Sequence, residues 1–193
     1  MRVAVCLSGQ PRAFEFCADN IRECFNVPGL GVSYHIHAWT RDTSPLGSKT
    51  ETVKVYRKEE LTEKLKSLFQ PKYLCVESVS EVPELVGTVP PTEQLYSLSK
   101  SLGSLKDCSY DWVFYSRMDW LRYTYYLDGR AVQERVHLDK IENAPKASRE
   151  IYVNYAGEEI WKGEDGGNLR IMNDWGFSCN WKTALIWSQI YSD

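Results

Sequence analysis

The sequence predicts an α/β fold with a mainly parallel central sheet flanked by helices. Short apolar runs that suit buried strands alternate with longer segments whose apolar residues recur every three or four positions, the period of a helix. Glycine, proline and short polar stretches separate these segments. The chain has 193 residues, of which 43% are hydrophobic, so it can bury the core of one such domain. Strands that alternate with helices in this way are typical of a doubly wound sheet.

In the first half of the chain, turn signals separate each strand from the helix beside it. The predicted elements are, in order, a strand over 2–7, a helix over 14–25, a strand over 32–39, a helix over 59–68 and a strand over 73–76. The first three form a β-α-β unit, in which Pro28 and Gly29 separate the helix from the second strand. Pro71 is the stop signal of the second helix.

The second half has fewer clear elements. We predict a helix over 92–105 after Pro90-Pro91, a strand over 112–116, a strand over 151–155 and a helix over 181–191. The last helical pattern reaches the final residue without a C-terminal cap or stop signal. We therefore expect residues 1–193 to form a single domain at the N-terminal end of a longer polypeptide.

Charge and cysteine usage narrow the classes of function. The formal net charge is −3 and the pI is near 5.7, which indicates no general attraction to nucleic acid or to an anionic membrane. No apolar stretch approaches the roughly 20 residues that span a bilayer, and the first apolar run is too short for a signal peptide. The six cysteines show no C-x-x-C pair and no His/Cys ligand spacing, so we expect buried thiols in a reducing compartment and no zinc site.

The strand over 112–116 ends on the polar residues that carry the strongest functional signal. Arg117 and Asp119 follow it two positions apart, so an extended backbone points both side chains to the same side. In open α/β sheets, ligands bind at the carboxyl ends of the strands. The spacing alone supports a ligand site and a solvent-facing ion pair equally.

A second cluster, Ser8-Gly9-Gln10-Pro11-Arg12, lies between the first strand and the first helix. Gly9 permits a close backbone approach, the helix offers N–H groups, and Arg12 can bind a phosphate through two hydrogen bonds. The segment is neither a Walker loop nor a G-x-G-x-x-G motif. It is therefore interpreted as a phosphate or nucleotide contact, with a simple turn as the alternative.

A third and a fourth group lie on the second strand and on the helix over 92–105. His35 and His37 share one face of the strand, where they suit either a metal site or, with more weight, hydrogen bonding near a ligand. Gln94, Ser97 and Lys100-Ser101 share one face of the helix. Either the start of this face points into the ligand site, or the face is exposed to solvent.

The segment Asn173-Asp174-Trp175-Gly176-Phe177 is the last cluster. A carboxylate beside Trp and Gly suits a catalytic base or a ligand for a sugar hydroxyl, and the alternative is an Asx turn. If these clusters converge, they meet at the carboxyl edge of the sheet.

Together the clusters resemble a known family. Leu-Ser-Gly-Gln-Pro-Arg at 7–12, after an apolar strand, is similar to the opening of a group of bacterial and large-DNA-virus glycosyltransferases with the nucleotide-diphospho-sugar transferase (GT-A) fold. The similarity continues at 35–39, which ends in His-x-Trp, and at Gln94, 110–120 and 173–177. It is nearest to chlorella-virus-type enzymes that build capsid glycans. The resemblance implies a single GT-A-like catalytic domain. From the lack of a membrane-spanning run and of a signal-like start we expect a cytoplasmic or cytoplasm-facing location, in the host cytoplasm if the protein is viral.

GT-A enzymes usually hold Mn²⁺ or Mg²⁺ with an Asp-x-Asp at a strand end, which bridges the ion to the donor diphosphate. Arg117-Met118-Asp119 takes that place here. The resemblance thus implies that Asp119 binds the metal ion and that Arg117 replaces the usual second carboxylate. One carboxylate, phosphate oxygens and water can still complete the coordination, and Arg117 adds positive charge against the diphosphate.

The resemblance also implies roles for the other clusters. The residues implied to bind the nucleotide-sugar are Ser8, Gly9, Gln10, Arg12, His37, Trp39, Gln94, Arg117 and Trp175. Asp174, with Asp119, is implied to be catalytic and to face the acceptor or the transferred sugar. If the reaction inverts the anomeric centre, Asp174 is the first choice for the base, ahead of Asp165 and Glu158, whereas a retaining reaction needs no dedicated base.

The leading hypothesis is a metal-assisted glycosyltransferase that moves a sugar from a nucleotide-diphospho-sugar, expected to be a UDP-sugar, to a glycan acceptor. The missing first Asp and the abrupt C-terminus keep open a non-catalytic nucleotide- or glycan-binding domain that serves catalytic domains downstream. A sugar nucleotidyltransferase shares the fold, but its N-terminal loop is normally Gly-rich and basic, and residues 8–12 hold too few glycines.

Overall fold

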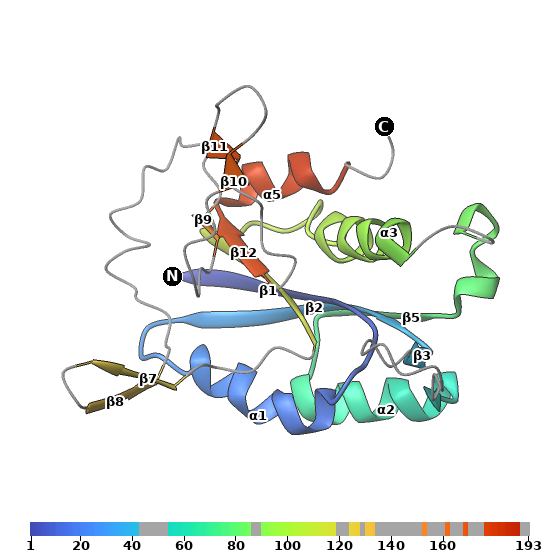
Figure 1. Ribbon diagram of the computed structural model, residues 1–193, viewed down its shortest axis with the longest axis horizontal. Helices are drawn as coiled ribbons and strands as arrows, with labels where there is room; N and C mark the ends of the chain where they lie inside the picture. Colours follow the sequence, from blue (N-terminus) through green and yellow to red (C-terminus); the bar gives the residue numbers. More distant parts are fainter. Residues whose placement is uncertain are drawn as a thin grey trace.

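The computed structural model describes residues 1–42, 54–85, 90–118, 124–127, 130–133, 152–153, 161–162, 168–169 and 176–189. It confirms the α/β prediction, because a mainly parallel sheet lies between helices on both of its faces (Figure 1). Within this part of the chain, no helix is both long and apolar enough to cross a membrane.

The central sheet has six strands in the order β5-β2-β1-β6-β12-β9. Its parallel strands are β1 (Arg2–Gly9), β2 (Gly31–Trp39), β5 (Tyr73–Glu77) and β6 (Trp112–Arg117). β12 (Gly176–Cys179) pairs antiparallel with β6, and β9 (Tyr152–Val153) pairs antiparallel with β12. The other described strands form separate antiparallel pairs: β3 (Arg41–Asp42) with β4 (Lys54–Val55), β7 (Thr124–Leu127) with β8 (Arg130–Gln133), and β10 (Trp161–Lys162) with β11 (Asn168–Leu169).

The parallel strands end together at one edge of the sheet, which we call the carboxyl edge. Their last residues are Gly9 in β1, Trp39 in β2, Glu77 in β5 and Arg117 in β6. β12 runs in the opposite direction, and its first residue, Gly176, pairs with Ser116. The start of β12 therefore lies at the same edge.

Two helices, α1 (Phe14–Cys24) and α2 (Lys58–Phe69), cover one face of the sheet and lie below it in Figure 1. Each turns one apolar stripe toward the sheet, because its buried residues recur three or four positions apart. These residues are Phe14, Cys17, Ala18, Ile21 and Cys24 in α1, and Leu61, Leu65 and Phe69 in α2. α1 ends one residue before the predicted Phe25, and α2 ends one residue beyond the predicted Leu68, just before Pro71.

The opposite face carries α3 (Pro90–Gly103) and α5 (Trp181–Trp187). α3 begins before the predicted Thr92, because a proline fits the first turn of a helix, where its missing N–H has no intrahelical partner to lose. Leu98 and Leu102 pack on the sheet as the pattern predicts, whereas Leu95 is 39% exposed. Two short 3₁₀ helices, η1 (Val79–Glu81) and η2 (Pro83–Leu85), connect β5 toward α3.

The helix predicted over 181–191 is shorter in the structure. Asn180 caps α5, since its side chain accepts a hydrogen bond from the Thr183 N–H at 2.9 Å. Trp181, Leu185 and Trp187 of this helix pack on the core, whereas Ile186 is 58% exposed. Residues 190–193 lie outside the described part of the chain.

Candidate functional site at the carboxyl edge

Four polar side chains lie side by side across the parallel strands, within two residues of the carboxyl edge. His37 of β2 is in register with Cys75 of β5 and with Ser8 of β1, and Ser8 is in register with Arg117 of β6. Side chains alternate between the two faces of a strand, so residues in register share a face. We call Cys75, His37, Ser8 and Arg117 the edge row, which lies on the face that α3 covers.

The row behind it, Tyr73, His35, Cys6 and Tyr115, is also in register and lies on the same face. His35 is 1% exposed, and both of its ring nitrogens have partners: Nδ1 lies 2.6 Å from Ser104 Oγ, and Nε2 lies 2.8 Å from Tyr110 Oη. Burial, with a smaller contribution from the charge of Lys72, lowers the pKa of His35 from 6.5 to about 4. The ring is therefore neutral at pH 7.

His37 is the most enclosed member of the edge row, with an exposed fraction of 0%. Its Nδ1 lies 2.6 Å from Ser97 Oγ on α3, and its Nε2 lies 2.8 Å from Glu77 Oε2 at the end of β5. Burial lowers the pKa of His37, although the carboxylate of Glu77 acts in the opposite direction. The hydrogen bond from His37 in turn lowers the pKa of Glu77. At neutral pH this pair is thus a neutral imidazole that donates to a carboxylate.

Ser8 also points into the protein. Its exposed fraction is 1%, and its Oγ lies 2.9 Å from the hydroxyl oxygen of Tyr115. Trp39, at the end of β2, is equally buried and lies edge-on to His37, with the ring centroids 4.7 Å apart. The side chains of Ser8, His37 and Trp39 therefore form a buried layer behind the edge, and their predicted contacts with a nucleotide-sugar stay predictions.

The segment after Ser8 turns sharply from β1 into α1. Gly9 has φ of +106°, a conformation that L side chains rarely adopt, so a substitution there is strained even though the space around it is open. Arg12 Nε donates to Gln10 Oε1 at 3.1 Å, and the Arg12 N–H donates to the Gln10 carbonyl at 2.8 Å. No side chain caps the start of α1. This loop follows the carboxyl end of β1 and carries Gln10 and Arg12.

The structure places Ser8, His37 and Arg117 side by side in register. Ser8, Gly9, Gln10 and Arg12 come from the end of β1, His37 and Trp39 from β2, Arg117 from β6, and Gln94 from the first part of α3. Asp119, Asp174 and Trp175 lie outside the described residues, as do Asp165 and Glu158. Of the segment 173–177, the structure describes the start of β12 at the carboxyl edge.

The helix face that includes Ser97 and Ser101 is neither solvated nor open to a ligand. Both serines have exposed fractions of 0%, because α3 packs this face against the sheet. Ser97 is a partner of His37, and Ser101 donates to the Leu98 carbonyl at 3.0 Å. The solvated alternative is therefore wrong for these two serines, while Lys100 is exposed.

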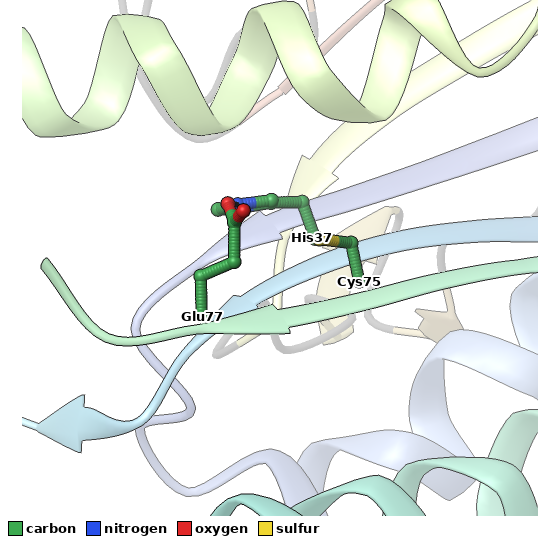
Figure 2. Close-up of side chains that lie close together, drawn as sticks. All are labelled: His37, Cys75 and Glu77. Carbon is green, nitrogen blue, oxygen red and sulfur yellow. Dashed lines mark hydrogen bonds and ion pairs between the residues drawn. The ribbon is translucent and has the colours of Figure 1, made fainter. Parts of the chain in front are cut away.

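The sequence analysis missed Glu77 and the position of Cys75. His37, Cys75 and Glu77 each offer a ligand atom, and these atoms lie within 4.8 Å of one another (Figure 2). Cys75 and Cys108 are only partly buried, which corrects the expectation that all six thiols are buried. Alternation along 73–77 places Cys75 and Glu77 on one face, but the pairing of β5 with β2 cannot be read from local spacing.

Comparisons with known proteins do not assign the chain to a family. No protein-family model matches it, and no curated protein matches it in sequence. The argument for function therefore rests on the residues at the carboxyl edge.

Proposed function

We propose that this chain is a glycosyltransferase that binds a nucleotide-diphospho-sugar, expected to be a UDP-sugar, at the carboxyl edge and transfers the sugar to a glycan acceptor. The observation that carries the proposal is the in-register placement of Ser8, His37 and Arg117 across three parallel strands, with Arg12 in the loop that follows β1. This edge is where open α/β sheets bind ligands. The resemblance of the motifs to GT-A enzymes supports the same site.

The proposal divides the site into contact and support. Arg12 and Arg117 supply guanidinium groups for the diphosphate, and Gly9, which has no side chain, lets the backbone approach it closely. Ser8 and His37 are held by Tyr115, Ser97 and Glu77, so they fix the strand ends on which the contact residues sit. This supporting role explains why Ser8 and His37 are polar and yet fully buried at a proposed binding edge.

Mn²⁺ or Mg²⁺ would be held by Asp119 together with the diphosphate, and would add charge stabilisation for the leaving group. The described residues around this edge include two cations, Arg117 at the end of β6 and Arg12 in the loop after β1, which suit phosphate oxygens rather than a metal ion. The metal assignment therefore depends on Asp119.

The chemistry follows from charge. The bond between the anomeric carbon and the diphosphate oxygen breaks, and the electron pair leaves with the nucleoside diphosphate. Arg12 and Arg117 stabilise the negative charge that develops there. The acceptor oxygen bonds to the anomeric carbon and loses its proton, which goes to Asp174 in an inverting reaction.

A non-catalytic nucleotide-binding domain is the second candidate. Arg117 stands where GT-A enzymes usually have a carboxylate, which weakens the binding of a cation but not that of a diphosphate. This domain would bind the same ligands and release no nucleoside diphosphate.

Thermal unfolding with a panel of nucleotide-sugars, with and without Mn²⁺, tests the proposal. A ligand at 100 times its Kd should stabilise the protein by about 2.7 kcal/mol. Arg12→Gln should weaken binding at least about 10-fold, because it removes a charge-assisted hydrogen bond. Arg22→Gln is the matched control, since Arg22 lies in the last turn of α1, at the other end of the helix that Arg12 precedes.

The proposal fails if no nucleotide-sugar changes the melting temperature. Binding without release of nucleoside diphosphate, with glycan acceptors supplied, would favour the binding domain. An equal effect of Arg12→Gln and Arg22→Gln would remove Arg12 from the site.

A further inference from the structure

We propose that His37, Cys75 and Glu77 bind one transition-metal ion of the Zn²⁺ type, at a site separate from the diphosphate site. The three side chains rise from β2 and β5 on the face of the sheet that α3 covers (Figure 2). Their ligand atoms lie within 4.8 Å of one another, close enough to share one ion.

The fold itself brings the three ligands together. His37 and Cys75 are direct neighbours in the register of two parallel strands, and Glu77 is two residues further along β5, on the same face. Because the ligands come from paired strands rather than from a loop, their backbone positions are fixed by the ladder of the sheet. The spacing within the sequence, 37, 75 and 77, contains no local metal motif.

The donor set determines the class of ion. An imidazole nitrogen, a thiolate sulfur and a carboxylate oxygen suit Zn²⁺, and also Co²⁺ as its stand-in, whereas Mg²⁺ and Mn²⁺ prefer oxygen ligands. Three protein ligands leave a fourth position for water or another ligand. The Glu77 side chain is 22% exposed and Cys75 is partly buried, so the site has a side toward solvent.

Only a small movement is needed to admit the ion. The His37 Nε2 to Glu77 Oε2 distance is 2.8 Å, a hydrogen bond. Two tetrahedral ligands at zinc distances lie about 3.3 Å apart. The partly exposed carboxylate therefore has to withdraw by about half an ångström, which the flexible side chain of Glu77 allows.

Two residues of α3 orient the ligands. Ser97 Oγ holds Nδ1 of His37 at 2.6 Å and so keeps Nε2 turned toward Cys75 and Glu77. The Tyr96 hydroxyl donates to Glu77 Oε2 at 3.3 Å. Contacts of this kind to the second nitrogen of a histidine and to a ligand carboxylate are usual around metal ions, where they fix the ligand orientation.

The protonation of the cluster fits metal binding with release of one proton. Burial lowers the pKa of His37, so the ring is neutral, as a ligand must be. Burial and the charge of Glu77 raise the pKa of the Cys75 thiol, while the charge of Lys100 acts to lower it. Tyr73 and Tyr96 are the other titratable groups that act on Cys75 or Glu77. When the ion binds, Cys75 gives up its proton, and the imidazole proton moves from Nε2 to Nδ1, where Ser97 accepts it. The thiolate and carboxylate then balance the charge of the ion.

Titration of the full chain with Co²⁺ tests this site, because a thiolate ligand gives a charge-transfer absorption band that oxygen and nitrogen ligands do not. One equivalent should produce the band, and Zn²⁺ should displace it. Cys75→Ser should remove the band and lower the affinity for Zn²⁺ at least about 100-fold, more than the loss of an orienting contact costs. Cys108→Ser, at the other partly buried thiol, should change neither.

Glu77→Gln, compared with Glu63→Gln on the exposed side of α2, gives the second measurement. Glu77→Gln should keep the thiolate band but bind the ion more weakly. For the wild type, calorimetry in buffers of different ionisation enthalpy should show that one proton is released for each ion bound. A band that survives Cys75→Ser, or no band in the wild type, overturns the proposal. Neither measurement uses a nucleotide-sugar, so its result is independent of the proposed transferase activity.

Discussion

The two faces of the central sheet are built from different side chains. Against α1 and α2 the sheet presents apolar residues, and the contacts are hydrophobic: Val3, Val5, Leu7, Ile36, Ala38, Ile21, Leu61 and Leu65 are all buried there. Against α3 it presents the apolar residues Ala4 and Val113 together with buried residues that form hydrogen bonds, Cys6, Ser8, His35, His37 and Tyr115. One face of the sheet is therefore apolar, and the other, which we call the polar face, combines apolar contacts with buried hydrogen bonds.

The two kinds of contact have different consequences: apolar contacts mainly stabilise the fold, whereas buried hydrogen bonds fix where a helix lies on the sheet. Apolar contacts stabilise in proportion to buried area and have little directional preference. Buried hydrogen bonds are directional, and an unsatisfied partner is costly in a low-dielectric interior. α3 cannot slide along the sheet without breaking the bonds of His37 to Ser97 and of His35 to Ser104. The polar face thus fixes where α3 lies, and the edge row is on that face.

The largest expected effect comes from the apolar face. Leu65→Ala should lower the free energy of unfolding by about 2–5 kcal/mol, because it leaves a cavity at a fully buried position. Leu95→Ala on α3 is the matched control, and its 39% exposure predicts a loss below about 1 kcal/mol. Urea denaturation measures both, and equal losses would mean that α2 is loosely packed on the sheet.

The next effect comes from the polar face. Ser97→Ala leaves Nδ1 of His37 without its partner inside the protein and should cost about 1–3 kcal/mol. Ser67→Ala, on the exposed side of α2, should change stability by less than about 0.5 kcal/mol. The same denaturation experiment compares the two serines. A negligible loss for Ser97→Ala would show that the hydrogen bond does not fix α3.

The elements of this fold are predictable from local patterns, since each depends on neighbours in sequence. The strands over 2–7, 32–39, 73–76 and 112–116 all form, with one boundary of each that differs by one or two residues. The exceptions have local causes: the first turn of α3 accepts Pro90, and α5 ends at Trp187 rather than at 191. Helix ends depend on capping and packing, which periodicity does not encode.

The sequence predicts that the candidate site lies at the carboxyl edge, but not which side chains meet there or how deeply each is buried. Strand ends identified Ser8, His37 and Arg117 as neighbours at one edge, because parallel strands end together. The role of Cys75 and Glu77 required the order β5-β2-β1, which depends on contacts far apart in sequence. Alternation places His37 on one face of the sheet, but whether a helix covers that face is a tertiary property.

The polar face should also make stability depend on pH. In the folded state the pKa of His35 is about 4, below its ordinary 6.5, so the unfolded chain binds more protons between these values. The stabilisation is complete above pH 6.5 and is lost as the pH falls toward 4. The expected loss from this group is about 3 kcal/mol. Urea denaturation across this pH range gives the free energy of unfolding of the wild type and of His35→Gln. Subtracting one from the other removes the contribution of the carboxylates, which both proteins share. A difference that does not change with pH would contradict the assignment to His35.

The smallest expected effect is the coupling between Ser8 and Tyr115, which joins the edge row to the row behind it. A double-mutant cycle with Ser8→Ala and Tyr115→Phe should give about 0.5–1 kcal/mol, the net value of one hydrogen bond between neutral groups. Ser8→Ala combined with Tyr34→Phe is the control, because Tyr34 packs against the α1 and α2 face. That cycle should show no coupling within about 0.3–0.5 kcal/mol.

The two cycles decide whether the faces act independently. If Ser8 couples to Tyr115 alone, the polar face is a local network that can be altered at the edge while the apolar face continues to hold the fold. Equal coupling to Tyr34 would mean that the sheet transmits changes from one face to the other, so that a substitution in the edge row would also disturb the packing of α1. In that case, weaker ligand binding by an edge-row variant could not be attributed to a lost contact until its stability had been measured in the same sample.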